Sequence, residues 1–97
     1  MAPRRSRFEI YVDVLTEINN GVNLPTKIMY GANMSWNTLM ETLEMLKAQG
    51  FIEEHTIDGK KRSRRRYTLT GKGNKVLSYL KKVKEILEPE AAVEIPF

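Results

Sequence analysis

Cysteine is absent from this 97-residue chain, and histidine occurs only once. These absences exclude disulfide bonds, thiolate chemistry and a multi-histidine metal site. No apolar run approaches the roughly 18–20 residues that a membrane-spanning helix needs, and the N-terminal MAPRRSRFEI lacks the apolar segment of a signal peptide. We therefore expect one small, soluble, cytoplasmic domain without a metal site.

Residues that would carry catalysis are also scarce. His55 stands alone in an acidic-flanked segment, where an exposed strand-edge role is more common than a role as a base. The GKG at 71–73 lacks the G-x-x-x-x-G-K-[ST] spacing of a phosphate-binding loop. We expect no enzymatic activity, no cofactor and no small-molecule ligand.

Positive charge, in contrast, is abundant and unevenly placed. Residues 1–84 hold all sixteen lysines and arginines against eight acidic residues, because four of the twelve acidic residues fall in the last thirteen positions. Six of the basic residues lie between Lys60 and Arg66, and RRSR at 4–7 adds three more. Such a clustered field suits a polyanion such as nucleic acid, or an anionic membrane surface.

Apolar spacing predicts three helices in the first half of the chain. The first covers residues 7–20, with Ser6 as N-cap and Gly21 as its stop. A short second helix begins at Pro25, and a third runs from the N-cap Ser35 to Gly50. The predicted apolar stripes are Phe8, Tyr11, Val12, Leu15 and Ile18 in the first helix, and Trp36, Leu39, Leu43 and Leu46 in the third.

The apolar period changes after the third helix. FIEEHTI and RRRYTLT alternate as strands do, and Asp58-Gly59 between them predicts a hairpin turn, with a longer loop through the basic stretch as the alternative. Thr70 would cap a last helix over 71–88 that Pro89 ends. We expect a mainly α fold with a small β-hairpin, the winged helix-turn-helix. Residues 1–70 would form the DNA-binding domain, 71–88 a C-terminal dimerisation helix and 89–97 a tail.

The corner between the second and third helices is short, since only GANM at 31–34 connects them. A DNA-reading corner needs apolar residues at fixed offsets and one residue that accepts positive φ. Asn33 suits the positive φ. We expect Trp36 to lie in the core, and the alternative is that it stacks outward at the start of the third helix. The apolar offsets are supplied by Ile28, Ala32, Met34 and Leu39.

A DNA-binding protein of this fold would place helix 35–49 in the major groove and the basic wing, residues 58–68, on the backbone or in the minor groove. The candidate DNA contacts are Arg4, Arg5, Lys27, Ser35, Asn37, Thr38, Glu41, Lys60, Lys61, Arg62, Arg64, Arg65 and Arg66. Arg65 shares the inward parity of Tyr67, so we expect it beyond the edge of the core. A solvated helix face and a solvated hairpin are the alternatives, because Glu41 and Glu44 would repel phosphates.

The last helix carries a second signal. Val76, Leu80, Val83 and Leu87 recur at spacings of four, three and four, as in a coiled-coil seam, and Leu77 and Ile86 broaden this stripe. These residues predict a homodimer through the C-terminal helix, in an antiparallel arrangement. The alternative is that the helix folds back onto the first helix of its own chain.

The segments IMYGANMSW, LKAQGFIEE and YTLTGKG resemble an archaeal winged-helix family that includes small, ten-kilodalton, coiled-coil-dimer DNA-binding proteins. The resemblance covers residues 7–88. It implies a cytoplasmic, nucleoid-associated homodimer that binds double-stranded DNA as a transcriptional regulator or a chromatin-type protein. The last helix is shorter here than in the coiled-coil members, and the tail is acidic with an apolar end.

Two other functions remain open from the sequence. A winged helix can serve as a protein–protein adaptor of a transcription complex, which would explain Glu41 and Glu44. RNA binding is a smaller alternative, disfavoured because the aromatic residues are isolated along the chain and do not form a stacking platform.

Overall fold

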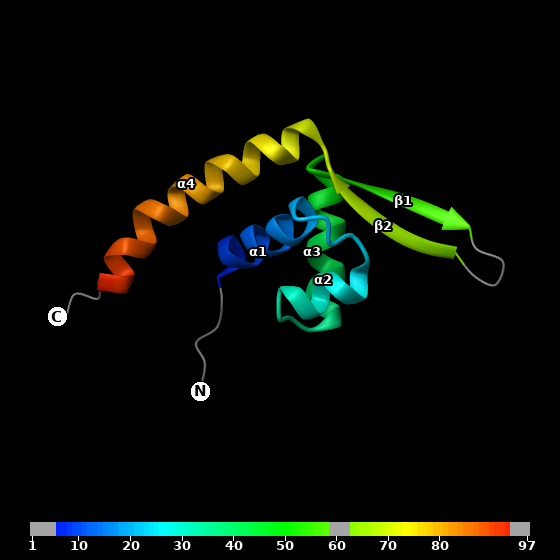
Figure 1. Cartoon of the computed structure of the whole chain (residues 1–97), viewed down its shortest axis with the longest axis horizontal. Helices are drawn as coiled ribbons and strands as arrows, with labels where there is room; N and C mark the ends of the chain where they lie inside the picture. Colours follow the sequence, from blue (N-terminus) through cyan, green and yellow to red (C-terminus); the bar gives the residue numbers. More distant parts are fainter. Residues whose placement is uncertain (1–5, 59–62, 94–97) are drawn as a thin grey trace.

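The computed structural model describes residues 6–58 and 63–93, and these form four helices and one hairpin (Figure 1). The elements are α1 (Arg7–Asn19), α2 (Pro25–Gly31), α3 (Trp36–Ala48), β1 (Ile52–Asp58), β2 (Ser63–Leu69) and α4 (Gly71–Val93). The predicted order of elements is confirmed. The fold is a winged helix-turn-helix in which the hairpin leaves the helical body on one side and α4 leaves it on the other.

Helix α1 lies at the centre of the helical body. Ser6 begins it with a capping box, in which its hydroxyl accepts from the Glu9 N–H and the Glu9 carboxylate accepts from the Ser6 N–H. The helix packs against α2, α3, α4 and β2, so it buries more than one face. This is why Val14, outside the predicted stripe, is fully buried, whereas Phe8 and Tyr11, inside it, are only half-buried.

The corner between α2 and α3 has the expected chemistry. Asn33 adopts a φ of 53°, the left-handed conformation that asparagine tolerates better than most residues. Ser35 then caps α3 by accepting a hydrogen bond from the Thr38 N–H at 3.2 Å. Ile28, Ala32 and Leu39 are buried where the two helices meet, as predicted.

The hairpin pairs β1 with β2 in antiparallel register, from Ile52 opposite Leu69 to Asp58 opposite Ser63. Asp58 is therefore a strand residue, and the longer-loop alternative holds. The connection itself, residues 59–62, lies outside the described residues. On the inner face Tyr67 is buried, and its N–H donates to the Asn23 carbonyl at 3.0 Å, which ties the hairpin to the body.

Helix α4 begins where predicted and ends later than predicted. The Thr70 hydroxyl accepts from the Gly73 N–H at 2.9 Å and donates to the Gly50 carbonyl at 2.6 Å, so it caps α4 and joins it to the end of α3. The predicted end at residue 88 is wrong, since α4 continues to Val93. Proline disfavours a helix interior because it removes one backbone hydrogen bond and crowds the preceding turn, but the residues after it, Glu90, Ala91 and Ala92, are good helix formers. Within residues 6–58 and 63–93, no helix combines the length and apolar character needed to cross a bilayer.

Candidate nucleic-acid interface

A groove joins the helix-turn-helix to the hairpin. It measures about 530 Å³ and is lined by Leu24, Pro25, Thr26, Lys27, Trp36, Arg64 and Arg65. These residues come from the start of α2, the start of α3 and strand β2. The start of the predicted reading helix and the basic strand therefore lie on one surface, together with Lys27.

The outward face of α3 is polar, as predicted. Ser35, Asn37 and Glu41 are exposed, and Thr38 is half-buried. The Ser35 hydroxyl is already engaged at the helix start, where it accepts from the Thr38 N–H and donates to the Thr38 hydroxyl at 3.0 Å. Asn37 and Glu41 are thus the side chains of this face with the most freedom to meet a ligand.

Trp36 contradicts its predicted place in the core. Its side chain is 47% exposed, whereas Leu39, Leu43 and Leu46 of the same predicted stripe are buried. Trp36 is the first residue of α3, and it lies in the groove beside the start of α2, beyond the end of the core. The helical period alone could not show that the core ends at Leu39.

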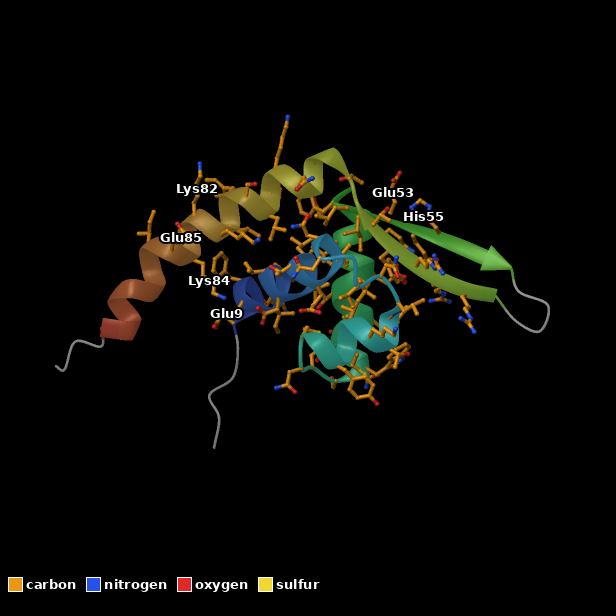
Figure 2. All side chains as sticks on the ribbon, in the orientation of Figure 1. Glu9, Glu53, His55, Lys82, Lys84 and Glu85 are labelled. Atoms are coloured by element: carbon orange, nitrogen blue, oxygen red, sulfur yellow. The ribbon has the colours of Figure 1, made fainter. Side chains whose placement is uncertain are left out.

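The arginines of β2 divide between the two faces of the hairpin. Arg65 has the same strand parity as Tyr67 and is exposed, so its predicted position beyond the edge of the core is confirmed. Arg64 and Arg66 are exposed and share the opposite parity with Thr68. Opposite them, the His55 Nε2 lies 2.9 Å from the Thr68 hydroxyl, and Figure 2 shows Glu53 and His55 on this side of the hairpin.

A polar network holds the base of the hairpin on α3. The Lys47 ammonium lies 3.2 Å from Glu54 Oε1, and the Tyr67 hydroxyl donates to the same oxygen at 3.1 Å. The hydrogen bond from Lys47 is the main cause that lowers the pKa of Glu54, with a smaller contribution from the charge of Arg65. The same hydrogen bond raises the pKa of Lys47.

Tyr67 completes this network from inside the hairpin. Burial is the main cause that raises the pKa of Tyr67, and the negative charge of Glu54 adds to the effect. The phenol therefore stays protonated and remains a donor to Glu54. The network joins the hairpin to α3 next to the part of β2 that carries Arg64, Arg65 and Arg66.

A second, smaller cavity of about 160 Å³ lies between α1 and α3. Its walls are Arg7, Ile10, Tyr11, Thr38, Glu41, Thr42 and Met45. Thr38 and Glu41 thus reach the α1 side of α3 as well as its outward face. Arg7 lines the same cavity as Glu41, so residues of opposite charge lie on its two walls.

Several predicted DNA contacts fall outside the part of the chain that the structure describes. Arg4, Arg5, Lys60, Lys61 and Arg62 lie outside the described residues. In the part of the chain that the structure describes, no group of three or more histidine, aspartate or glutamate side chains is placed to hold a metal ion.

Helix α4 packs its first half against α1 of the same chain. Leu77 is buried, and Val76 and Leu80 pack against the core, so the intramolecular alternative holds for these residues. Figure 2 likewise shows Lys84 below α4, on the side of α1, while Lys82 points away from the body. Leu87 lies outside the residues whose side chains are described.

Among the side chains of α4 that the structure describes, two large apolar ones remain exposed: Ile86, which was predicted to broaden the apolar stripe, and Tyr79, which was not predicted. Tyr79 is 67% exposed and Ile86 is 68% exposed. Together with Val76 and Val83 they recur at spacings of three, four and three, which is also a heptad pattern. The helix therefore carries two apolar rows, and the sequence alone could not tell which row covers its own domain.

Comparison with known proteins agrees with this architecture. A family model described as winged helix-turn-helix matches residues 4–88. The uncharacterized protein MJ0287 of Methanocaldococcus jannaschii is 32% identical over 84 residues, which are 87% of this chain and 78% of that protein. The uncharacterized protein MJ0290 of the same organism is 31% identical over 87 residues, and this chain spans only 37% of its length.

Solved structures share the fold at lower identity. Sso10a-2, a DNA-binding protein from Sulfolobus solfataricus, superposes with a TM-score of 0.78 at 22% identity, over 93% of this chain and 90% of that one. A PadR family transcription regulator from Clostridium difficile gives 0.68 at 17% identity, over 81% of this chain and 92% of that one. A MarR family transcriptional regulator from Silicibacter pomeroyi superposes with a TM-score of 0.72 at 18% identity, over 92% of this chain and 59% of that one. The fold is thus one that DNA-binding proteins and transcription regulators use.

Proposed function

This chain belongs to the winged helix-turn-helix family, and on that premise we propose that it binds double-stranded DNA as a homodimer. Helix α3 would enter the major groove, and the hairpin would follow the adjacent backbone or minor groove. The observation that carries this proposal is the shared surface, on which Lys27, the start of α3 and two arginines of β2, Arg64 and Arg65, line one groove.

Charge supports the proposal in a specific way. Arg64, Arg65 and Arg66 are all exposed, and Lys27 extends the positive surface onto α2. Each phosphate that a lysine or arginine neutralises releases a counterion, so affinity falls steeply with salt. Contacts of this kind position a protein on DNA without reading its sequence.

Base reading would fall to the exposed polar residues of α3. Asn37 can pair in a bidentate manner with adenine, and Glu41 can accept from the amino group of cytosine. Both are exposed, whereas the Ser35 and Thr38 hydroxyls are used to start the helix. Few base contacts against many phosphate contacts favour weak sequence preference.

Dimerisation would use the two exposed apolar residues of α4. Tyr79 and Ile86 are exposed apolar side chains one heptad apart, and burying them against a second copy would be favourable. Two linked domains would bind two half-sites, and the second contact gains affinity through effective concentration. This arrangement differs from the predicted seam at Val76, Leu80, Val83 and Leu87, because Val76 and Leu80 already pack within the chain.

The proposed localisation and cellular role follow from the binding of duplex DNA. A protein that binds duplex DNA through a sequence-tolerant surface would be cytoplasmic and nucleoid-associated, as a transcriptional regulator or a chromatin-type protein. We expect no enzymatic activity.

A salt titration of duplex binding tests the proposed function. With roughly six phosphates neutralised, the logarithm of the association constant should fall with the logarithm of salt at a slope of about −5. Random and genomic fragments are compared at each salt concentration: similar affinities indicate chromatin-type coating, and a large preference indicates a regulator. No binding at low salt would contradict the proposal and favour the adaptor role.

A further inference from the structure

Trp36 has surroundings that duplex binding does not explain. Its indole is 47% exposed at the first position of α3, in a groove whose other walls include the apolar Leu24 and Pro25. Lys27 and Arg65 line the same groove from two different elements. A large exposed aromatic ring is therefore held between positive charges that come from α2 and β2.

This combination is the one that single-stranded nucleic acids use. An aromatic ring offers a stacking surface to any unpaired base, and basic side chains beside it follow the sugar-phosphate backbone. A base inside a duplex is stacked on both sides, so it cannot offer its flat face to an indole. The groove volume, about 530 Å³, lies in the range of about 300–1,000 Å³ that small-molecule sites occupy.

We propose that this groove binds an unpaired nucleotide, with the base stacked on Trp36 and the flanking phosphates on Lys27 and Arg65. The binding shares the cationic surface of the proposed duplex site but needs only one strand, which could be DNA or RNA. The isolated aromatics of the sequence argued against such a site. The fold changes that argument, because it places one of them among cations that are far apart along the chain.

Trp36 is the only tryptophan in the chain, so its fluorescence reports on this groove alone. Short oligothymidine and oligouridine strands are titrated into the full chain at low salt. Stacking predicts saturable quenching of the tryptophan emission. Binding of either strand with quenching supports the proposal, and the ratio of the two affinities tells whether DNA or RNA is preferred.

Three variants test the role of the ring by the anisotropy of labelled single strands. Trp36→Ala should weaken binding roughly tenfold or more, because one stacked base is lost. Trp36→Phe should keep most of the affinity, since a phenyl ring still stacks. Tyr30→Ala is the matched control: it removes a ring that is 74% exposed on α2 but does not line the groove, and it should bind as the parent does.

The outcomes separate this proposal from duplex binding. Strand binding without quenching, or unchanged affinity in Trp36→Ala, would overturn the stacked nucleotide even if duplexes bind well. Quenching by single strands with no duplex binding would support this site and contradict the proposed function. Thermal melts of each variant check that the fold is intact.

Discussion

Replacing Arg64 and Arg66 together by glutamine should weaken duplex DNA binding without disturbing the hairpin. Both side chains are exposed and lie on the strand face opposite the buried Tyr67. They take no part in the hydrogen bonds that join Glu54 to Lys47 and Tyr67 at the base of the hairpin. The substitution therefore removes two charges from the surface and leaves the packing of the hairpin unchanged.

The size of the effect follows from counterion release. If each arginine neutralises one phosphate, the loss of two contacts reduces the salt slope by about 1.8, since each contact contributes about 0.9. The slope should change from about −5 to about −3.5. At 0.1 M salt the same relation gives a loss of affinity of roughly 60-fold, and at 0.2 M of roughly 20-fold.

Fluorescence anisotropy of a labelled duplex, measured from 0.05 to 0.3 M salt, gives both quantities. The matched control is Lys81→Gln with Lys82→Gln, which removes the same net charge from exposed positions on α4, away from the hairpin. The control should keep a slope near −5. If the hairpin variant and the control lose the same affinity, the effect comes from net charge, and the hairpin has no direct part in binding.

Three further changes probe stability and assembly, and thermal or sedimentation measurements check them. Gly73→Ala should destabilise the fold by about 1–3 kcal/mol, because the added Cβ would overlap the Phe51 carbonyl. Gly71→Ala is the control: its Cβ meets no atom within 4 Å, so this variant should melt at the same temperature as the parent. Asn33→Ala should cost about 1–2 kcal/mol at its φ of 53°, and Asn33→Gly should cost less; equal melting of the two would contradict a left-handed turn. Tyr79→Glu with Ile86→Glu should raise the dissociation constant of a dimer at least 30-fold. The control, Asn74→Glu with Ser78→Glu, adds the same charge at other exposed positions of α4 and should leave the dissociation constant unchanged. A parent chain that sediments as a monomer would refute the interface.

The pH dependence of stability tests the network at the base of the hairpin. Because the pKa of Glu54 is lowered in the fold, its contribution is complete above the ordinary carboxyl pKa of about 4.3 and is lost as the pH falls through the lower folded-state value. Thermal melts from pH 7 to pH 2 should therefore show a smaller acid-induced loss in Glu54→Gln than in the parent. An identical pH profile in the two proteins would mean that the Lys47 contact adds no stability.

The sequence predicted the features that depend on local chemistry. Ser6 and Ser35 cap helices because a hydroxyl before an apolar run can accept from the third N–H, wherever the helix later packs. Asn33 takes the left-handed turn position because few other residues accept it. Such requirements act within four residues, so they can be recognised before the fold is known.

The features that depend on packing between distant segments were not predictable in the same way. Whether Trp36 is buried depends on where the core ends, and that is decided by α1 and α2. Which apolar row of α4 covers the domain depends on the angle at which Thr70 and Gly73 start that helix against the end of α3. Neither the end of the core nor the starting angle of α4 leaves a periodic pattern in the sequence.

The candidate site falls between these two cases. The positive charge of Arg64–Arg66 and the polar face of α3 were evident from residue types and spacing. Their meeting around Lys27 and Trp36 required the fold, because β2 is far from α2 and α3 along the chain. The exposed position of Trp36 was the less favoured alternative, because no local signal distinguishes it from a core tryptophan.

An NMR titration of the ¹⁵N-labelled protein with a short duplex tests the central claim most directly. The account predicts that backbone amide shifts concentrate at Lys27, at residues 35–41 and at residues 64–66, while the exposed residues of α4 stay unchanged at equal protein concentration. Shifts confined to α4, or the absence of shifts at low salt, would show that the groove between α2, α3 and β2 is not where this protein meets DNA.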